Sequence, residues 1–256
     1  MTHEEKRVYL TRYLLDEAGY KNEIPESEEE QKYLLRGLMN IREPKPIGSD
    51  FLTIQDEYLQ EVVEDKGVVD VESLEPIRDR LYLWRGDITR LRIDAIVNAA
   101  NSGMCGCFQA NHSCIDNIIH TVSGVQLRLY CSDLMTDQGY PEPTGKAKIT
   151  PAYNLPCKYV IHTVGTICRG RVSARNIQEL ESCYRSCMKI ADENGVRSIA
   201  FCCISTGVFG FPKQSGAETA IRTVEECIAA VAKVEKVVFN VFSPEDEEYY
   251  REILQK

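Results

Sequence analysis

The sequence has no apolar run that could cross a lipid bilayer, which takes about 18 or more consecutive apolar residues. It also lacks the pattern of a secretory leader, a basic N-terminal segment followed by an apolar stretch. These absences exclude a membrane-spanning class of protein. We therefore expect a protein that stays in the cytoplasm and has no membrane partner.

The cysteines do not form the pattern of a disulfide framework. Their number, 11, is odd, and Cys202 and Cys203 lie inside an apolar run. Buried thiols and a metal-binding cluster are typical of a reducing compartment. The sequence therefore favours free cysteines, some of which can serve as metal ligands.

No excess of basic residues is present, because the chain has 30 Lys and Arg against 39 Asp and Glu. The acidic excess lies in residues 1–80, which carry 20 acidic and 11 basic residues, whereas residues 81–256 carry 19 of each. A phosphate backbone is bound by clustered Lys and Arg, so a nucleic-acid partner is not expected. The acidic region is either a solvated face or a docking surface.

The first part of the chain has helical patterns and no cluster of catalytic residue types. Helices are predicted at 4–18, from Ser27 to about Met39, and from Asp50 to Glu64. Residues 1–70 are therefore predicted to form a helical N-terminal extension. It can stabilise the main domain, shape the rim of its site or dock a modified protein.

Residues 71–256 are predicted to form one α/β domain, because short β-branched runs alternate with longer helical patterns. The predicted strands are Leu81–Trp84, Ala95–Asn98, Ala147–Thr150, Tyr159–Thr163, Ser198–Cys203 and Lys236–Val241. The predicted helices are 113–123, 125–136, 174–193, 213–233 and 245–255.

The segment 105–114 brings three thiols and an imidazole within ten residues. Thiolate and neutral imidazole are the ligand types that zinc prefers. Cys107, His112 and Cys114 can converge ahead of the helix predicted to follow. A three-ligand set leaves a position open, as in a catalytic site, whereas recruitment of Cys105 would close the site and make it structural. Unrelated buried cysteines and a surface histidine are the alternative.

Two further segments lie at predicted strand ends. Residues 205–212 are rich in small residues between a strand and a helix, and such a loop can hold a diphosphate through backbone N–H groups. Asp87, Asn98 and Asn101 also follow or end strands, where ligands of open α/β sheets bind. A plain connection and ordinary turn-forming residues remain the alternatives. His120 and His162 are expected to be packed inside the domain.

Taken together, the motifs GDIT at 86–89, IVNAAN at 96–101, IDNIIH at 115–120, PAYNLPCKYVIHTVGT at 151–166 and ISTGVFGFP at 204–212 resemble the macrodomain family. The resemblance covers roughly residues 75–256 and implies a three-layer α/β/α fold with a mixed central sheet. It also implies a cleft at the strand ends that binds ADP-ribose.

Carried onto this sequence, the resemblance implies that Asp87 contacts the adenine amino group, Ile88 gives a neighbouring backbone contact, and Asn101 reads the distal ribose. It implies a catalytic role for Asp116, with Asn101. Phe242 and Asp246 match the adenine pocket more loosely. The residues implied as the diphosphate loop are Ser205, Thr206, Gly207, Val208, Phe209, Gly210 and Phe211.

The chain departs from hydrolytic macrodomains between Asn101 and Asp116, where a run of glycines is replaced by GMCGCFQANHSC. In this it resembles a zinc-containing microbial subgroup found beside a sirtuin-type ADP-ribosyltransferase and its lipoylated carrier protein. That likeness implies Zn²⁺ held by Cys107, His112 and Cys114, with Cys105 outside the ligand set.

The function expected from these features is zinc-dependent removal of mono-ADP-ribose from modified proteins, by cleavage at the distal ribose. ADP-ribose, ADP-ribosylated protein and the lipoylated carrier are the expected partners. Two alternatives stay open: a module that only binds ADP-ribose and has a structural zinc, and a deacylase of O-acyl-ADP-ribose.

Overall fold

The computed structural model describes residues 1–255. Its helices are α1 (His3–Ala18), α2 (Glu28–Ile41), α3 (Ser49–Asp65), α4 (Ile115–Ser123), α5 (Val125–Gln138), α6 (Ala174–Glu193), α7 (Lys213–Ile228) and α8 (Pro244–Leu254), with short 3₁₀ helices η1 (Val71–Ser73) and η2 (Ile88–Arg90). Its strands are β1 (Val69–Asp70), β2 (Leu81–Arg85), β3 (Leu91–Arg92), β4 (Ala95–Ala100), β5 (Ala147–Pro151), β6 (Tyr159–Val164), β7 (Ser198–Phe201) and β8 (Lys236–Val241). Among these described residues, no helix has the length and apolar composition needed to span a membrane.

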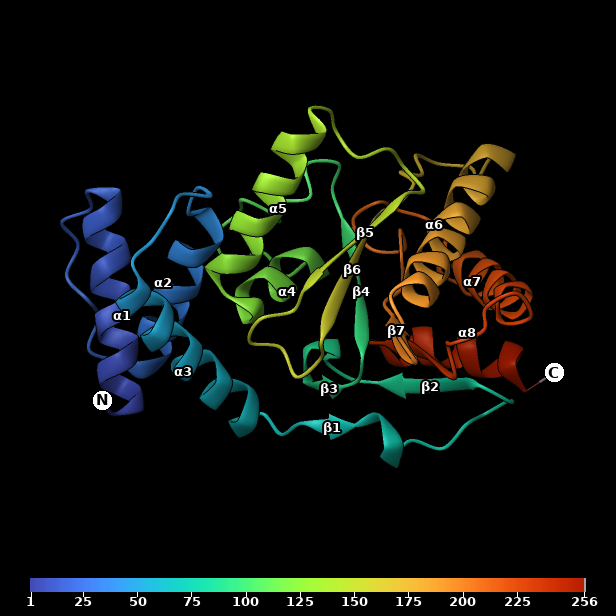
Figure 1. Ribbon diagram of the computed structural model, residues 1–256, viewed down its shortest axis with the longest axis horizontal. Coiled ribbons are helices and arrows are strands. Elements are labelled where there is room, and N and C mark those ends of the chain that lie inside the picture. Colours follow the sequence, from blue (N-terminus) through green and yellow to red (C-terminus); the bar gives the residue numbers. More distant parts are fainter. Residues whose placement is uncertain (256) are drawn as a thin grey trace.

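Six strands form the central sheet in the order β2-β8-β7-β4-β6-β5. All neighbouring pairs are parallel except β5 and β6, which makes the sheet mixed. Helices α4 and α5 lie on one side of the sheet, and α6, α7 and α8 lie on the other (Figure 1). Covered on both faces, the inner strands are almost entirely buried and mostly apolar, and β7 is buried at every position. The predicted three-layer α/β/α fold is therefore confirmed.

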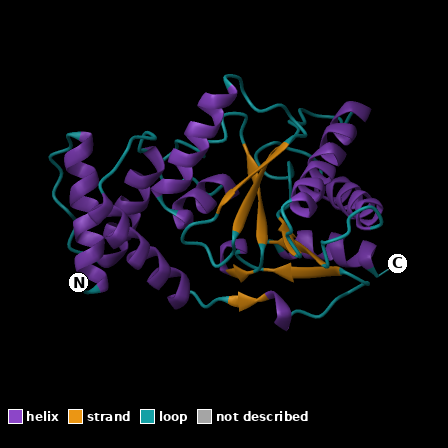
Figure 2. Cartoon of the chain, in the orientation of Figure 1, coloured by secondary structure: helices purple, strands orange, loops and turns teal. Residues whose placement is uncertain are grey.

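The N-terminal helices form a further layer outside α4 and α5 (Figure 2). Leu10, Leu35 and Phe51 belong to a second hydrophobic cluster, which also takes in Val125 at the start of α5. The backbone N–H of Val125 donates to Gln55 Oε1 at 3.0 Å, so α3 and α5 share polar contacts as well. Val63 of α3 packs in the main core together with Val71, and the boundary at residue 70 stays a prediction.

Two helices begin or end at residues other than those predicted from the sequence, because a side chain accepts hydrogen bonds from the backbone there. Helix α4 begins at Ile115 rather than at residue 113, because Cys114 acts as its N-cap. Helix α7 ends at Ile228 instead of residue 233. Beyond this point the backbone N–H groups of Ala232 and Lys233 donate to Asp192 Oδ1, at 2.9 and 2.6 Å, which draws the chain away from the helix axis.

Candidate active site

The carboxyl ends of four neighbouring parallel strands, β2, β8, β7 and β4, lie along one edge of the sheet. Asp87 follows β2, the segment 205–211 follows β7, and Asn101 follows β4. Three strand spacings of about 4.8 Å give this edge a span of roughly 15 Å. The sequence-predicted ligand residues from distant segments thus lie in a row along one edge of the sheet.

At the β2 end, Asp87 is the N-cap of η2 and accepts hydrogen bonds from the backbone N–H of Thr89, at 3.0 Å, and from its hydroxyl, at 2.6 Å. Ile88 is buried, with 1% of its surface exposed. After β8, Phe242 is 78% exposed. Asp246, at the start of α8, accepts a hydrogen bond from the Ser243 hydroxyl at 2.6 Å. An exposed aromatic ring beside a fixed carboxylate is a surface on which a base can stack.

In the middle of the edge, the loop between β7 and α7 turns sharply. Ser205 has a φ of +67°, and the backbone N–H of Phe211 donates to Ser205 O at 2.9 Å, which closes the loop. Within residues 1–255, the N–H groups of Gly207, Val208 and Phe209 donate to no protein acceptor. Three successive free N–H groups just ahead of a helix are suited to binding an anion.

A glycine just after β6, two strands away from β7 in the sheet, leaves room for this loop. A Cβ atom at Gly165 would lie 2.4 Å from Ser205 Oγ, and the backbone N–H of Cys168 donates to Phe209 O at 2.7 Å. The segment after β6 therefore packs against the loop between β7 and α7 and stabilises it. The sequence prediction included the loop but not this support.

At the β4 end, Asp116 is 4% exposed and both of its carboxylate oxygens are held by amides. Asn98 Nδ2 donates to Oδ1 at 2.8 Å, and Asn101 Nδ2 donates to Oδ2 at 3.2 Å. Burial raises the pKa of Asp116 to about 6, although the two amides and the nearby Arg128 oppose this shift. A fixed carboxylate with a pKa near neutrality can take up or release a proton at working pH.

The loop between Asn101 and α4 gathers three ligand-type side chains. Ligand atoms of Cys107, His112 and Cys114 all lie within 4.8 Å of one another, and Cys107 Sγ is 3.5 Å from His112 Nδ1. Burial, together with the neighbouring Cys107 thiol, raises the pKa of Cys114 to about 11. Two thiols and an imidazole held together in this way fit a soft divalent cation.

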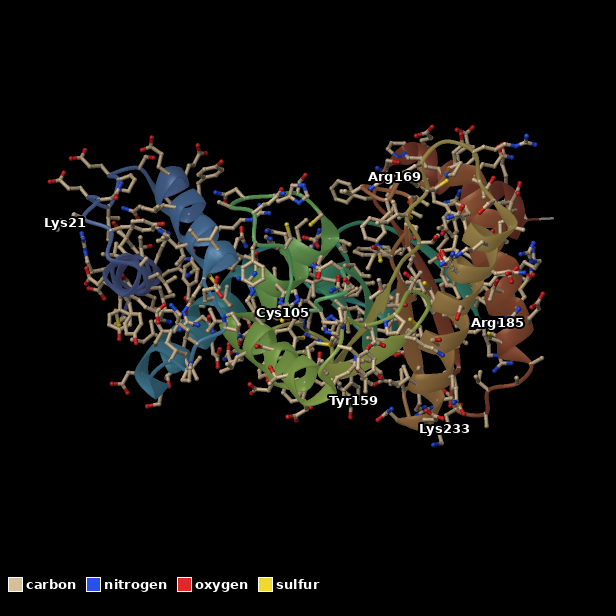
Figure 3. All side chains as sticks on the ribbon, turned by 90° about the horizontal axis from the view of Figure 1, so that it is seen from above. Lys21, Cys105, Tyr159, Arg169, Arg185 and Lys233 are labelled. Carbon is tan, nitrogen blue, oxygen red and sulfur yellow. The ribbon has the colours of Figure 1, made fainter. Side chains whose placement is uncertain are left out.

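Cys105 does not belong to this group of ligand atoms, although it is in the same loop. Its side chain packs against the main core, and its backbone oxygen accepts a hydrogen bond from Arg128 Nε at 2.8 Å. Figure 3 shows Cys105 in the middle of the molecule, between the N-terminal helices and the strands. The structure thus gathers the three residues named from the sequence without the fourth thiol.

Helix α2 lies outside the main core and contacts the loop between Asn101 and α4, the ligand loop. Arg36 Nη2 donates to the backbone oxygen of His112 at 2.7 Å and to Asn117 Oδ1 at 3.2 Å. Asn40 Oδ1 accepts from the backbone N–H of Asn111 at 2.9 Å. Sequence reasoning missed these residues, because 76 positions separate Arg36 from His112 and no local pattern links them.

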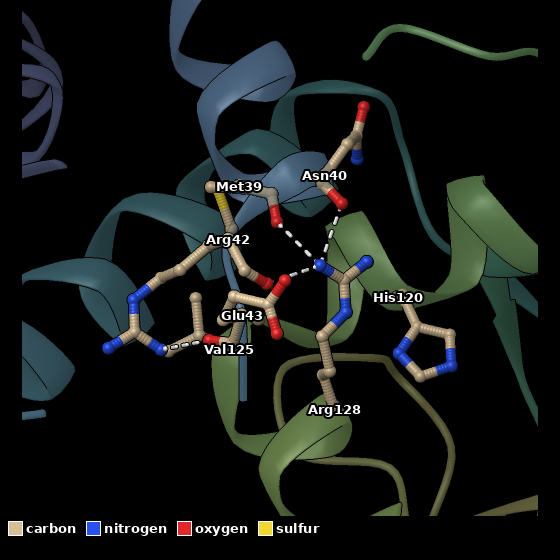
Figure 4. A pocket seen from close by; sticks show the side chains of 8 residues that line it. Met39, Asn40, Arg42, Glu43, His120, Val125 and Arg128 are labelled. Atoms are coloured by element: carbon tan, nitrogen blue, oxygen red, sulfur yellow. Dashed lines mark hydrogen bonds between the residues drawn. The ribbon is translucent and has the colours of Figure 1, made fainter. Parts of the chain in front are cut away.

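Arg128 on α5 joins the end of α2 to the same loop. Its Nη1 donates to the backbone oxygens of Asn40 and Arg42, both at 2.7 Å, in a small pocket that His120 also lines (Figure 4). The guanidinium lies 4.2 Å from the centre of the Phe108 ring. A single buried cation therefore fixes helix α2 and the ligand loop relative to each other.

His120 and His162 are buried, as expected. His162 Nδ1 lies 3.1 Å from Asn98 Nδ2 and its Nε2 lies 3.0 Å from Thr150 Oγ1. Burial lowers the pKa of His162 to about 3 and holds the pKa of His120 well below its usual value. Both rings are therefore neutral at physiological pH. His162 contacts Asn98, and His120 contacts Asp116.

These features define a three-layer α/β protein with a loop of free N–H groups and a ligand-type Cys and His cluster along the carboxyl edge of its sheet. The profile of the Macro domain family matches residues 97–220. A protein from Treponema medium named protein-ADP-ribose hydrolase is 54% identical over 99% of this chain and 100% of its own length. The chain therefore belongs to the macrodomain family.

Two other relatives give the same assignment. A protein-ADP-ribose hydrolase from Staphylococcus aureus is 50% identical over 91% of this chain and 88% of its own length. The crystal structure of the Trypanosoma brucei macrodomain in complex with ADP-ribose superposes with a TM-score of 0.66 at 28% identity. That alignment covers 82% of this chain and 92% of the other.

Proposed function

We propose that this protein is an enzyme that removes mono-ADP-ribose from modified proteins, and that a zinc ion held by Cys107, His112 and Cys114 is required for the reaction. The main support for hydrolysis is the identity of 54% to a protein-ADP-ribose hydrolase over nearly the whole chain. The main support for zinc is the convergence of three soft ligand atoms within 4.8 Å of one another beside the site.

We propose that ADP-ribose lies along the carboxyl edge of the sheet, with adenine near Asp87 and Ile88 and the distal ribose near Asn101. The free N–H groups of the loop Ser205–Phe211 support binding of the diphosphate between these two ends. The solved macrodomain with bound ADP-ribose supports the class of ligand.

The chemistry of the site follows from the position of Asp116. Its two carboxylate oxygens are fixed by Asn98 and Asn101, and it lies in the first turn of α4, directly after the ligand loop. In the proposed reaction this carboxylate orients a water or a ribose hydroxyl and accepts its proton. Zinc, when bound, supplies Lewis acidity toward an oxygen of the sugar or lowers the pKa of a bound water.

The three ligand-type side chains support the resemblance to the zinc-containing macrodomain subgroup, and we propose its lipoylated carrier protein as a candidate substrate. The two alternative functions, a module that only binds ADP-ribose and a deacylase of O-acyl-ADP-ribose, have less support, because the similar proteins are named protein-ADP-ribose hydrolase. Each alternative predicts a different result in the experiment that follows.

The test is release of labelled ADP-ribose from a mono-ADP-ribosylated protein before chelation, after chelation and after zinc is added back. We expect release that stops on chelation and returns with zinc. Because a metal supplies several kcal/mol of transition-state stabilisation, Cys107→Ala should lower turnover by about 100-fold or more. The matched control is Cys105→Ala in the same loop, which should keep its metal and its turnover.

Two outcomes would contradict the proposal. Tight binding of ADP-ribose without any release would indicate a binding module. Faster turnover of O-acyl-ADP-ribose than of the modified protein at equal concentration would indicate a deacylase.

A further inference from the structure

An apolar groove of about 740 Å³ lies between the N-terminal helices and the tip of the ligand loop. The helices α1 and α2, which supply most of its lining, lie on the outer side of the molecule, away from β2 (Figure 1). The side chains that form its apolar surface are Leu15, Tyr20, Tyr33, Leu34, Leu38 and Ala110.

Large apolar side chains in this groove are exposed. Tyr33 is 66% exposed, Tyr20 is 47% exposed and Ile41 is 37% exposed, although all three line one surface. A contiguous apolar surface of this kind is unfavourable in water and is typical of a protein-binding site. Tyrosine is also a residue that commonly anchors protein interfaces.

The charge around the groove specifies the kind of partner. Residues 20–30 contain five glutamates and one lysine. Glu23, Glu29 and Glu30 line the groove itself. A nucleic acid or an acidic peptide would be repelled, whereas a peptide with Lys or Arg beside apolar side chains would complement both the floor and the rim.

The groove adjoins the loop that carries the proposed metal ligands. Ala110 and Asn111 line it, and the next residue in the chain is the proposed ligand His112. The backbone N–H of Asn111 is held by Asn40, so this end of the groove is fixed relative to the ligand loop. A peptide that lies in the groove is therefore beside the end of the site proposed for the distal ribose, where the modified protein must emerge.

We propose that the groove binds a segment of the ADP-ribosylated protein that carries Lys or Arg beside apolar side chains. This inference rests on the proposed function. The groove holds the protein part of the substrate while the carboxyl edge of the sheet holds the ADP-ribose part, so affinity for the modified protein exceeds affinity for free ADP-ribose.

The binding test uses two fluorescent ten-residue peptides without ADP-ribose, one alternating Leu and Lys and one alternating Leu and Glu. We expect the full-length protein to bind the Lys peptide and not the Glu peptide. Tyr33→Ala and the double variant Glu23→Gln, Glu29→Gln should each weaken binding at least about fivefold, because they remove an anchor or the charge of the rim.

Matched controls separate the groove from general charge attraction. Tyr140→Ala removes a tyrosine that is 61% exposed outside the groove, and the pair Glu248→Gln, Glu252→Gln removes two exposed charges on α8. Both should bind the Lys peptide within twofold of the unsubstituted protein. Equal weakening by the control variants, a preference for the Glu peptide, or a dimer that Tyr33→Ala dissociates would each overturn the inference.

The same two peptides carrying one mono-ADP-ribosylated residue separate this inference from the proposed function. We expect a higher kcat/KM for the Lys peptide, and groove variants that raise its KM about fivefold with little change in kcat. Hydrolysis of both peptides at one rate by every variant would overturn the groove and leave the function intact. Absence of any hydrolysis, with the Lys peptide still bound in the groove, would overturn the function instead.

Discussion

At the residue scale, Asp116 is the group whose surroundings are most closely fitted to a chemical role. Both of its oxygens are occupied by amide donors, from Asn98 and Asn101, and only 4% of the residue is exposed. Asn98 in turn contacts the ring of His162, so a buried chain of polar groups fixes the orientation of the carboxylate. Such a chain restricts rotation more than a single hydrogen bond does.

Replacing this carboxylate by an amide of the same size tests its role. Asp116→Asn should lower kcat by about 100-fold, because a general base commonly contributes 10² to 10⁴. Binding of free ADP-ribose should change less than about threefold, since the substitution is isosteric. Asp137→Asn on α5 is the control, as Asp137 is exposed. Full turnover by Asp116→Asn would show that another group moves the proton.

His162 determines part of the pH dependence of stability. Burial holds its folded-state pKa at about 3, whereas an unfolded histidine has a pKa near 6.5. Below about pH 6.5 the unfolded chain binds a proton that the folded chain does not, so stability falls as the pH falls. His162→Gln removes this contribution and leaves that of His120.

The measurement for His162 is urea unfolding of both proteins between pH 6.5 and pH 4.5. The stability advantage of the unsubstituted protein over His162→Gln should shrink by about 2 kcal/mol across this range, by linkage. A constant difference would mean that the ring binds a proton as readily in the folded protein as in the unfolded chain.

The gathering of three ligand-type side chains was predictable from residue identity and spacing. Cys107, His112 and Cys114 stand close together in the chain, and their chemistry is narrow enough to indicate a metal. The roles of Asp87, Asn101 and Ser205–Phe211 came from the family resemblance and stay predictions. The support from Gly165 was not predictable, because a Cβ clash with Ser205 depends on two distant strand ends meeting.

At the scale of elements, helix α2 orients the loop that carries the metal ligands. Arg36 holds the carbonyl of His112, and Asn40 holds the N–H of Asn111, whose φ of +56° is an unfavourable conformation for most residues. Outer-shell contacts of this kind set the orientation of ligands. The helix therefore belongs functionally to the site, although it precedes the main domain in the chain.

Removing one of these contacts should weaken metal binding without removing a ligand. Arg36→Ala is expected to lower zinc affinity by about 10- to 100-fold, the usual effect of losing an outer-shell contact. Competition with a chromogenic chelator measures it. Lys32→Ala, on the same helix but with its ammonium 2.7 Å from Glu28 only, is the control. Equal zinc affinity for both variants would mean that the loop holds its own shape.

Element types were predictable and element ends were less so. Long periodic segments such as α6 (Ala174–Glu193) were predicted at their observed limits. The strands β1 and β3 have two residues each and were not predicted, since so short a segment has no periodicity. Ends set by a side chain elsewhere, such as Asp192 beyond α7, depend on tertiary contacts that spacing cannot supply.

At the scale of the whole molecule, the N-terminal helices contact the macrodomain through both apolar and polar side chains. Val125 of α5 packs with the N-terminal cluster, and Asn154 Nδ2, from the segment after β5, donates to Asp56 Oδ1 at 2.7 Å. The sequence predicted a helical extension and its acidic character. It left open whether the extension stabilises, shapes or docks, because that depends on contacts across 70 or more residues, such as that from Val125 to Gln55.

Deleting residues 1–66 distinguishes these roles. Loss of the second cluster exposes Val125, and loss of α2 releases the ligand loop, so both stability and metal binding should fall. We expect a decrease in Tm of about 10 °C or more, corresponding to roughly 3 kcal/mol, and a protein that does not retain zinc. A truncated protein with unchanged metal content would confine the extension to stabilisation or docking.

The proposed zinc requirement is tested most directly by the metal content of freshly purified, active protein, measured together with its activity. We expect about one zinc per chain in the unsubstituted protein and in Cys105→Ala, and almost none in Cys107→Ala. Chelation should remove the zinc and the release of ADP-ribose together. Fully active protein without stoichiometric metal would contradict this requirement and leave only the ADP-ribose-binding edge of the sheet.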